Sequence, residues 1–253
     1  IDLIGKLVGL PKTFNRGVEL FKTYASGSSV MGKENSWEMW DASGVLAKIL
    51  EQKPDKGLKT LRSIWSDSDG LNFNQQILVT NSIQKVSNGA VLVRIYEDFL
   101  KPRLERILSI SLNDEGAVAS LENIGPIEAI LKPTIRENLV EFAQKLAVAK
   151  RFQPALELVR LLILDSDPPQ NYEDYNNPTD EKEDFNYGRK VTEGEDVITI
   201  NTVRGRCAWV LQKFITLDGR AFIPRAVPLV RRLAFDGNPY VRLQACVPLI
   251  ELV

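Results

Sequence analysis

The chain has 253 residues, of which 44% are hydrophobic and 26% charged, and its formal net charge is −1. This composition is typical of a globular protein, and no apolar run approaches the roughly 18 residues that a membrane span needs. The absence of histidine excludes imidazole bases, Ser-His and Cys-His catalytic pairs and histidine-ligated metals. Two cysteines are too few for a thiolate metal site or a disulfide framework, so we expect neither a metal nor a cofactor.

The first residues do not resemble a signal peptide, because Asp2, Lys6 and Lys12 interrupt the apolar positions. The chain begins with Ile1 rather than Met. We therefore expect a segment of a larger protein, and the low cysteine count favours a reducing cytoplasm.

Apolar residues recur three or four positions apart along most of the chain, as at Phe14, Val18 and Phe21. This spacing places them on one side of a helix. Alternation with period two is scarce, and residues 197–200 form its best example. The fold class is therefore predicted to be all-α. The predicted helices cover residues 2–25, 36–52, 55–66, 73–87, 90–100, 102–112, 115–131, 133–149, 153–164, 200–215, 221–234 and 239–252.

Capping residues and prolines divide these apolar stripes into short helices. Ser36 and Asn72 are predicted N-caps, because their side-chain oxygens can accept hydrogen bonds from the first turn. Pro102 separates two stripes and predicts a kink or a break. Many short helices with short links favour an α-solenoid of stacked antiparallel pairs. Other prolines are placed in first turns, where a missing N–H costs nothing: Pro54, Pro126, Pro133, Pro154 and Pro224.

Residues 165–196 differ from the rest of the chain. They contain eleven acidic and three basic residues, a net charge of −8, which leaves +7 for the remainder. A stretch this polar buries too little apolar surface to offset its ordering entropy. We therefore predict a helical region at 1–164, an acidic loop insertion at 165–196 and a repeat region at 197–253.

The repeat is read from two matching sequences, each built around a Val-Arg pair. Val203-Arg204 and Val241-Arg242 are both followed by a small residue three positions after the arginine and by a leucine seven positions after it. The two arginines are 38 residues apart, near the period of roughly 40 of HEAT repeats. Together with Asp236 and the proline-containing turn after it, residues 197–253 resemble the HEAT-repeat family.

The resemblance implies that Asp236 and Arg242 belong to an ion-pair ladder between stacked repeats. The alternative is that Arg242 binds a ligand. Two features depart from the family pattern. Ile198 stands where the first unit should have Asp, and Pro248 lies inside the second helix, where it predicts a kink or an early end. Residues 1–164 show no Val-Arg signature that aligns, so degenerate repeats, a tetratricopeptide-like domain and a bundle all stay open.

Basic residues gather in the repeat region, which carries a net charge of +5. Arg206, Trp209 and Lys213 share one flank of the predicted helix 200–215, which the resemblance places on a concave surface. Three readings stay open for this surface: phosphate contacts with Trp209 stacking on a base, an acidic protein partner or the acidic insertion, and a solvated face. The next helix adds further candidate binding residues: Arg225, Arg231 and Arg232.

Two other pairs of residues are candidate sites. Trp37 and Trp40 share one side of a helix, where core packing is favoured over a partner platform. Cys207 and Cys246 occupy similar repeat positions and are predicted to be small buried hydrophobic residues rather than a redox pair.

No phosphate loop, dinucleotide-binding or hydrolase nucleophile motif is present in the sequence. The leading hypothesis is a non-enzymatic scaffold or regulatory module that binds a protein partner. The alternative is a nucleic-acid-binding HEAT-like protein, related in its concave face to HEAT-like DNA glycosylases, although no catalytic carboxylate can be assigned. A sensor part of a multidomain NTPase is the third hypothesis.

Overall fold

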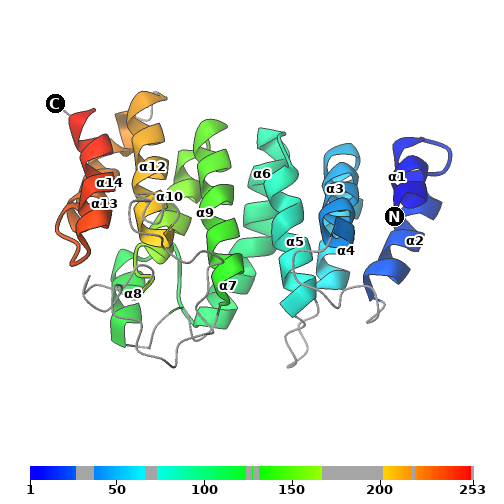
Figure 1. The fold of residues 1–253 in the computed structure, drawn as a ribbon, viewed down its shortest axis with the longest axis horizontal. Helices are drawn as coiled ribbons and strands as arrows, with labels where there is room; N and C mark the ends of the chain where they lie inside the picture. The colour runs from blue at the N-terminus through cyan, green and yellow to red at the C-terminus, as the bar shows by residue number, and fades with distance from the viewer. Residues whose placement is uncertain are drawn as a thin grey trace, which may run out of the picture. The chain divides into compact units, whose positions relative to one another are not determined.

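The computed structural model describes residues 1–26, 37–65, 73–123, 127, 131–166, 202–217 and 220–251 (Figure 1). Within these ranges the secondary structure is helical and contains no strand, which confirms the all-α class. The chain forms two compact units, Ile1–Ser109 and Ile110–Val253. The strand-like run at 197–200, the predicted caps Ser36 and Asn72, and residues 167–196 lie outside the described residues.

The N-terminal unit is a set of helices that pack on their chain neighbours. α1 packs against α2 and α3, and α3 packs against α4 and α5. The prediction that Pro54 begins a helix is confirmed, because it is the first residue of α4. The helices of this unit are α1 (Asp2–Gly9), α2 (Phe14–Ser26), α3 (Trp37–Gln52), α4 (Pro54–Ile64), α5 (Phe73–Lys85), α6 (Gly89–Ile95), the π-helix Tyr96–Leu100 and α7 (Lys101–Leu108).

The prediction of one helix over residues 2–25 is wrong, because the chain breaks between Gly9 and Phe14. Leu10 is extended, with φ −109° and ψ 127°, as expected for a residue that precedes a proline. The Thr13 hydroxyl donates to the Leu7 carbonyl over 2.8 Å and closes the turn. The prediction that one side of this helix is apolar and faces the core is confirmed in α2, where three residues of that side are buried: Phe14, Val18 and Phe21.

Pro102 does not break the helical run, because the π-helix Tyr96–Leu100 passes directly into α7 and Pro102 lies in the first turn of α7. Proline has no N–H, so the carbonyl of Asp98, four residues earlier, lacks its usual helical donor. The Arg62 guanidinium donates to that carbonyl over 2.9 Å. The run ends at Leu108 rather than at residue 112, because Ser109 adopts a left-handed conformation with φ 52°.

The C-terminal unit arranges its long helices in two rows. α9, α12 and α14 form one row, in which α12 packs against both neighbours, and α10 and α13 lie behind them (Figure 1). α10 and α13 each pack against α12. The elements are α8 (Glu115–Ala119), the 3-10 turn Ser120–Asn123, α9 (Pro133–Val148), α10 (Phe152–Leu162), α12 (Val203–Thr216), the 3-10 turn Arg220–Phe222, α13 (Ile223–Ala234) and α14 (Pro239–Ile250).

Two local expectations for this unit are corrected. The α-helix predicted over residues 115–131 stops at Ala119 and becomes a 3-10 turn, and Pro126 lies outside the described residues. Pro248 does not end α14, which continues to Ile250. The buried stripe predicted for the helix near residue 210 is confirmed: Val203, Cys207, Val210, Leu211 and Phe214.

Two helical glycines give opposite predictions for replacement by alanine. A Cβ on Gly57 of α4 would lie 2.7 Å from both Cα and Cδ2 of Leu50, whereas a Cβ on Gly44 of α3 would have no neighbour within 4 Å. Alanine is the better helix former by about 1 kcal/mol, but overpacking costs about 1–3 kcal/mol. We expect Gly57→Ala to lower the free energy of unfolding and Gly44→Ala to raise it, as measured by urea denaturation. Equal shifts for both variants would contradict this packing.

Candidate functional site

A buried ion pair joins the start of α12 to the turn before α14. Arg204 is 1% exposed, and its Nε and Nη2 donate to the two carboxylate oxygens of Asp236 over 2.8 and 3.0 Å. Its Nη1 donates to the main-chain carbonyl of Asp165 over 2.5 Å. Asp236 also accepts from the N–H of Asn238, which caps α14. The guanidinium therefore exchanges water for three protein oxygens and fixes α12 against the α13–α14 turn.

A second buried pair repeats this arrangement one step earlier in the chain. Arg136 of α9 is 1% exposed; its Nε lies 2.5 Å from Asp165 Oδ2, and its Nη1 donates to the Leu131 carbonyl. Because Asp165 also accepts from Arg204 through its carbonyl, the two pairs form one connected chain.

Sequence reasoning missed the second pair. It placed Asp165 in a solvated acidic loop, but Asp165 is 1% exposed. The signal was present in the sequence, because Pro133-Thr134-Ile135-Arg136 and Pro239-Tyr240-Val241-Arg242 follow the same pattern. In each, a proline is followed by a variable residue, a β-branched residue and an arginine.

Arg242 plays a different part from Arg204. Its Nη1 donates to the main-chain carbonyls of Asp236 and Gly237 over 2.7 and 2.9 Å, and the carboxylate of Asp236 goes to Arg204. The remaining predicted repeat positions, Val203 and Val241, are buried.

The cation–aromatic strip predicted on α12 lies between helices. Arg206 donates to the carboxylate of Glu141 on α9 over 2.7 Å, and Trp209 Nε1 donates to Gln244 Oε1 on α14 over 2.5 Å. Trp209 is 39% exposed and Lys213 is half-buried. Arg206 and Trp209 therefore link α12 to both of its row neighbours.

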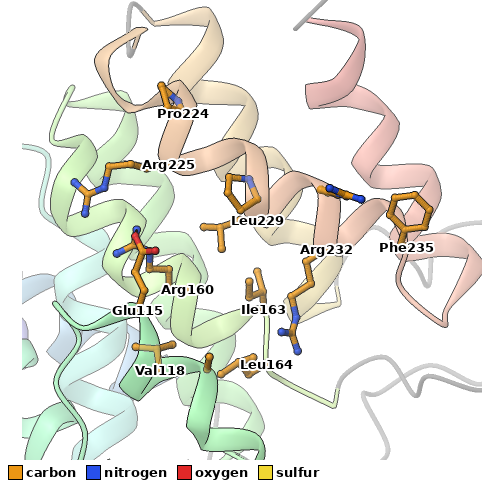
Figure 2. Close-up of a pocket in the computed structure, with 13 residues that line it drawn as sticks. Glu115, Val118, Arg160, Ile163, Leu164, Pro224, Arg225, Leu229, Arg232 and Phe235 are labelled. Atoms are coloured by element: carbon orange, nitrogen blue, oxygen red, sulfur yellow. The ribbon is translucent and has the colours of Figure 1, made fainter.

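The other three candidate binding residues, Arg225, Arg231 and Arg232, line one open groove between α8, α10 and α13, with a volume of about 600 Å³ (Figure 2). We call it the arginine groove. Four arginines and one glutamate line it, and apolar side chains make up most of the rest. Its lining residues are Glu115, Val118, Ala119, Arg160, Ile163, Leu164, Pro224, Arg225, Pro228, Leu229, Arg231, Arg232 and Phe235.

The spacing of residues on α13 explains how this helix builds one wall. Ala226, Val230 and Leu233 are buried. Arg225, Leu229 and Arg232 recur at helical intervals on another side, which faces the groove. α10 and α13 each pack on α12, and the groove lies in the space between them. Sequence reasoning identified the arginines of α13 but missed Arg160 and Glu115, because the helices that meet here are far apart in the chain.

Trp40 and Cys246 do not follow the core-packing prediction. Trp40 is 59% exposed, and Lys85 Nζ lies 3.5 Å from its ring centroid, while the side chain of Trp37 lies outside the described part. Cys246 is exposed and Cys207 is buried, and both are free thiols. Burial raises the pKa of the Cys207 thiol, with the charge of Asp165 acting in the same direction.

Searches for chemistry and for relatives add no further site. The described residues contain no group of three or more His, Cys, Asp or Glu side chains placed to hold a metal ion. None of the described helices has both the length and the apolar character needed to cross a bilayer. Comparison of the chain with protein-family models, curated proteins and solved structures finds no match.

The buried pair should matter far more for stability than an exposed one. Arg204→Met leaves Asp236 as an uncompensated buried charge, which typically costs about 3–5 kcal/mol. The matched control is Arg94→Met, because Arg94 and Asp55 form a 2.7 Å pair that is 43% and 82% exposed, and solvent screens the attraction within such a pair. Urea denaturation followed by circular dichroism measures both losses. Similar small losses would show that the Arg204–Asp236 pair does not hold the unit together.

Thiol labelling tests the burial of the two cysteines. In the native protein at pH 8 we expect N-ethylmaleimide to modify Cys246 and to leave Cys207 unmodified, because burial keeps that thiol both inaccessible and protonated. In denaturant both cysteines should react. Mass spectrometry counts the adducts, and Cys246→Ser should remove the native adduct while Cys207→Ser keeps it. Rapid native labelling of two thiols would be inconsistent with this structure.

Proposed function

We propose that the chain is a non-enzymatic protein-interaction module built from HEAT-like helix pairs. The connected pairs Arg136–Asp165 and Arg204–Asp236 support a repeated unit, because equivalent arginines at the starts of α9 and α12 meet equivalent aspartates. The two rows of helices in the C-terminal unit support stacking of such units as an α-solenoid. A role as a scaffold or regulatory part of a larger cytoplasmic protein belongs to this proposal, and two free thiols agree with a reducing compartment.

The arginine groove is the observation that carries the proposal. Its lining combines four guanidinium groups with an apolar floor and a single carboxylate. Cations around apolar surface fit a protein segment that carries both acidic and apolar side chains, since each type of side chain then meets its complement. The interaction surface is therefore assigned to α8, α10 and α13 rather than to the strip on α12.

Nucleic-acid binding is the competing hypothesis, and the contacts of α12 weigh against its predicted form. The Trp209 indole N–H and the Arg206 guanidinium are already engaged by Gln244 and Glu141. A glycosylase-like activity would also need a catalytic carboxylate, which neither the sequence nor the described structure assigns.

The proposal predicts that an acidic peptide binds through α13. The probe is a fluorescein-labelled peptide of alternating glutamate and leucine, followed by anisotropy with the full chain. Combining Arg225→Gln, Arg231→Gln and Arg232→Gln should weaken binding by at least about tenfold, because the three guanidinium groups neutralise the peptide carboxylates. The melting temperature should change little.

The matched control removes three exposed positive charges from the N-terminal unit through Lys12→Gln, Arg16→Gln and Lys59→Gln. It should bind the probe like the unmodified chain. Equal weakening by both triple variants would indicate non-specific attraction and reject the groove. A single-stranded DNA oligonucleotide that binds more tightly than the peptide, with a steep fall in affinity as salt rises, would instead support the competing hypothesis.

A further inference from the structure

Arg160 is the most constrained cation in the arginine groove. It lies on α10, its side chain is 5% exposed, and its Nη2 donates to a carboxylate oxygen of Glu115. Its Nη1 is buried and has no hydrogen-bond partner among the described residues. A buried charged donor without an acceptor destabilises the folded state. The Arg160 end of the groove therefore holds a guanidinium group that is only partly paired.

A second guanidinium faces the same end. Arg225 of α13 donates to Gln153 Oε1, and Figure 2 shows the Arg160 and Arg225 side chains on the same side of the groove. Burial lowers the pKa of Arg160, and the positive charge of Arg225 lowers it further, whereas Glu115 and Glu157 act in the opposite direction. An anion between the two guanidinium groups would relieve both the repulsion and the missing acceptor.

Glu115 shows what kind of group fits beside Arg160. It is the first residue of α8, a helix of five residues, and its side chain is 69% exposed while that of Arg160 is 5% exposed. The carboxylate of Glu115 is therefore open to solvent, so an incoming anion can exchange with it at Arg160. Because Glu115 is itself a carboxylate, the geometry already accommodates that group.

The rest of the groove indicates what should be attached to the anion. Leu229 lies between the Arg160 end and the Arg232 end (Figure 2), and Val118 and Ile163 add to the apolar lining. At the far end the Phe235 ring is 79% exposed, with the Arg231 guanidinium carbon 6.0 Å from its centroid. The groove therefore alternates cation, apolar floor and cation.

A protein segment fits this lining better than a nucleic acid does. Phosphates gain nothing from the apolar floor, whereas a peptide side chain buries apolar area against Leu229 and Ile163. The groove is short, so it takes a few residues of an extended chain at about 3.3 Å per residue.

We propose that the arginine groove binds an acidic segment of a partner protein, and that one carboxylate of this segment replaces Glu115 at Arg160 and bridges Arg160 to Arg225. This inference rests on the proposed function and adds the anchoring contact. Glu115 is then an internal competitor that occupies the anchor position until the partner arrives.

Removing the competitor tests the proposal through a change at an exposed side chain. Glu115→Gln should tighten binding of the glutamate–leucine peptide by roughly two- to fivefold, the range set by an exposed ion pair. The matched control is Glu19→Gln, because Glu19 is 72% exposed and pairs with Lys22 in the N-terminal unit. It makes the same change in net charge and should leave the affinity unchanged. Arg225→Gln alone should weaken binding by at least about fivefold and remove the gain from Glu115→Gln.

The outcomes separate the two proposals. If the α13 triple variant loses binding but Glu115→Gln binds no more tightly than the unmodified chain, the anchor is rejected and the interaction module stands. If neither variant changes binding, both proposals fail. Two further results would show that something other than an acidic segment of a partner occupies the groove. Either result would contradict the proposed contact of a partner carboxylate with Arg160. One is a dimer in sedimentation that the triple variant abolishes. The other is peptide binding seen only after the acidic residues within 173–184 are replaced by Gln and Asn.

Discussion

The structure of the C-terminal unit depends on the neutralisation of buried guanidinium groups. Taking a charge out of water costs several kcal/mol unless protein oxygens replace the solvent. Arg136 and Arg204 therefore each require a carboxylate and a carbonyl at fixed positions, and they find them at Asp165, Asp236 and nearby main chain. Apolar packing alone is non-directional, whereas these bonds specify how far each helix can slide along its neighbour. The positions of α10 and α13 on α12, and with them the width of the arginine groove, follow from that register.

Arginine serves three purposes in this unit, and burial decides which one. Arg204 is 1% exposed and its charge is fully matched, so it contributes to structure. Arg231 and Arg232 are exposed, so their charges lie at the surface. Arg160 lies between these cases, since it is buried like Arg204 but its Nη1 has no acceptor among the described residues. Burial together with a place in the groove lining, rather than positive charge as such, is what distinguishes the proposed anchor from a solvated face.

Local pattern predicted many of the helices, and the errors have physical causes. The stripe of α12 was predicted because helical periodicity is a property of neighbouring residues. The continuation through Pro102 was missed because the guanidinium that satisfies the freed carbonyl comes from Arg62, on another helix. Trp40 was expected in the core, but Lys85 covers part of its ring from α5. Both of these errors concern a group whose partner is distant in sequence, so spacing carried no information about it.

The amino-acid sequence by itself determined that the chain is helical, which side of α12 is apolar and that α13 carries a row of arginines, because these properties arise within a few turns of one helix. Only the tertiary structure decided which charges meet. Arg204 reaches Asp236 across 32 positions, and Arg160 reaches Glu115 across 45. Such pairs form when packing brings helices together, and within the described part of the chain the same packing left one nitrogen of Arg160 without an acceptor. The arginine groove exists because α10 and α13 share α12 as a support.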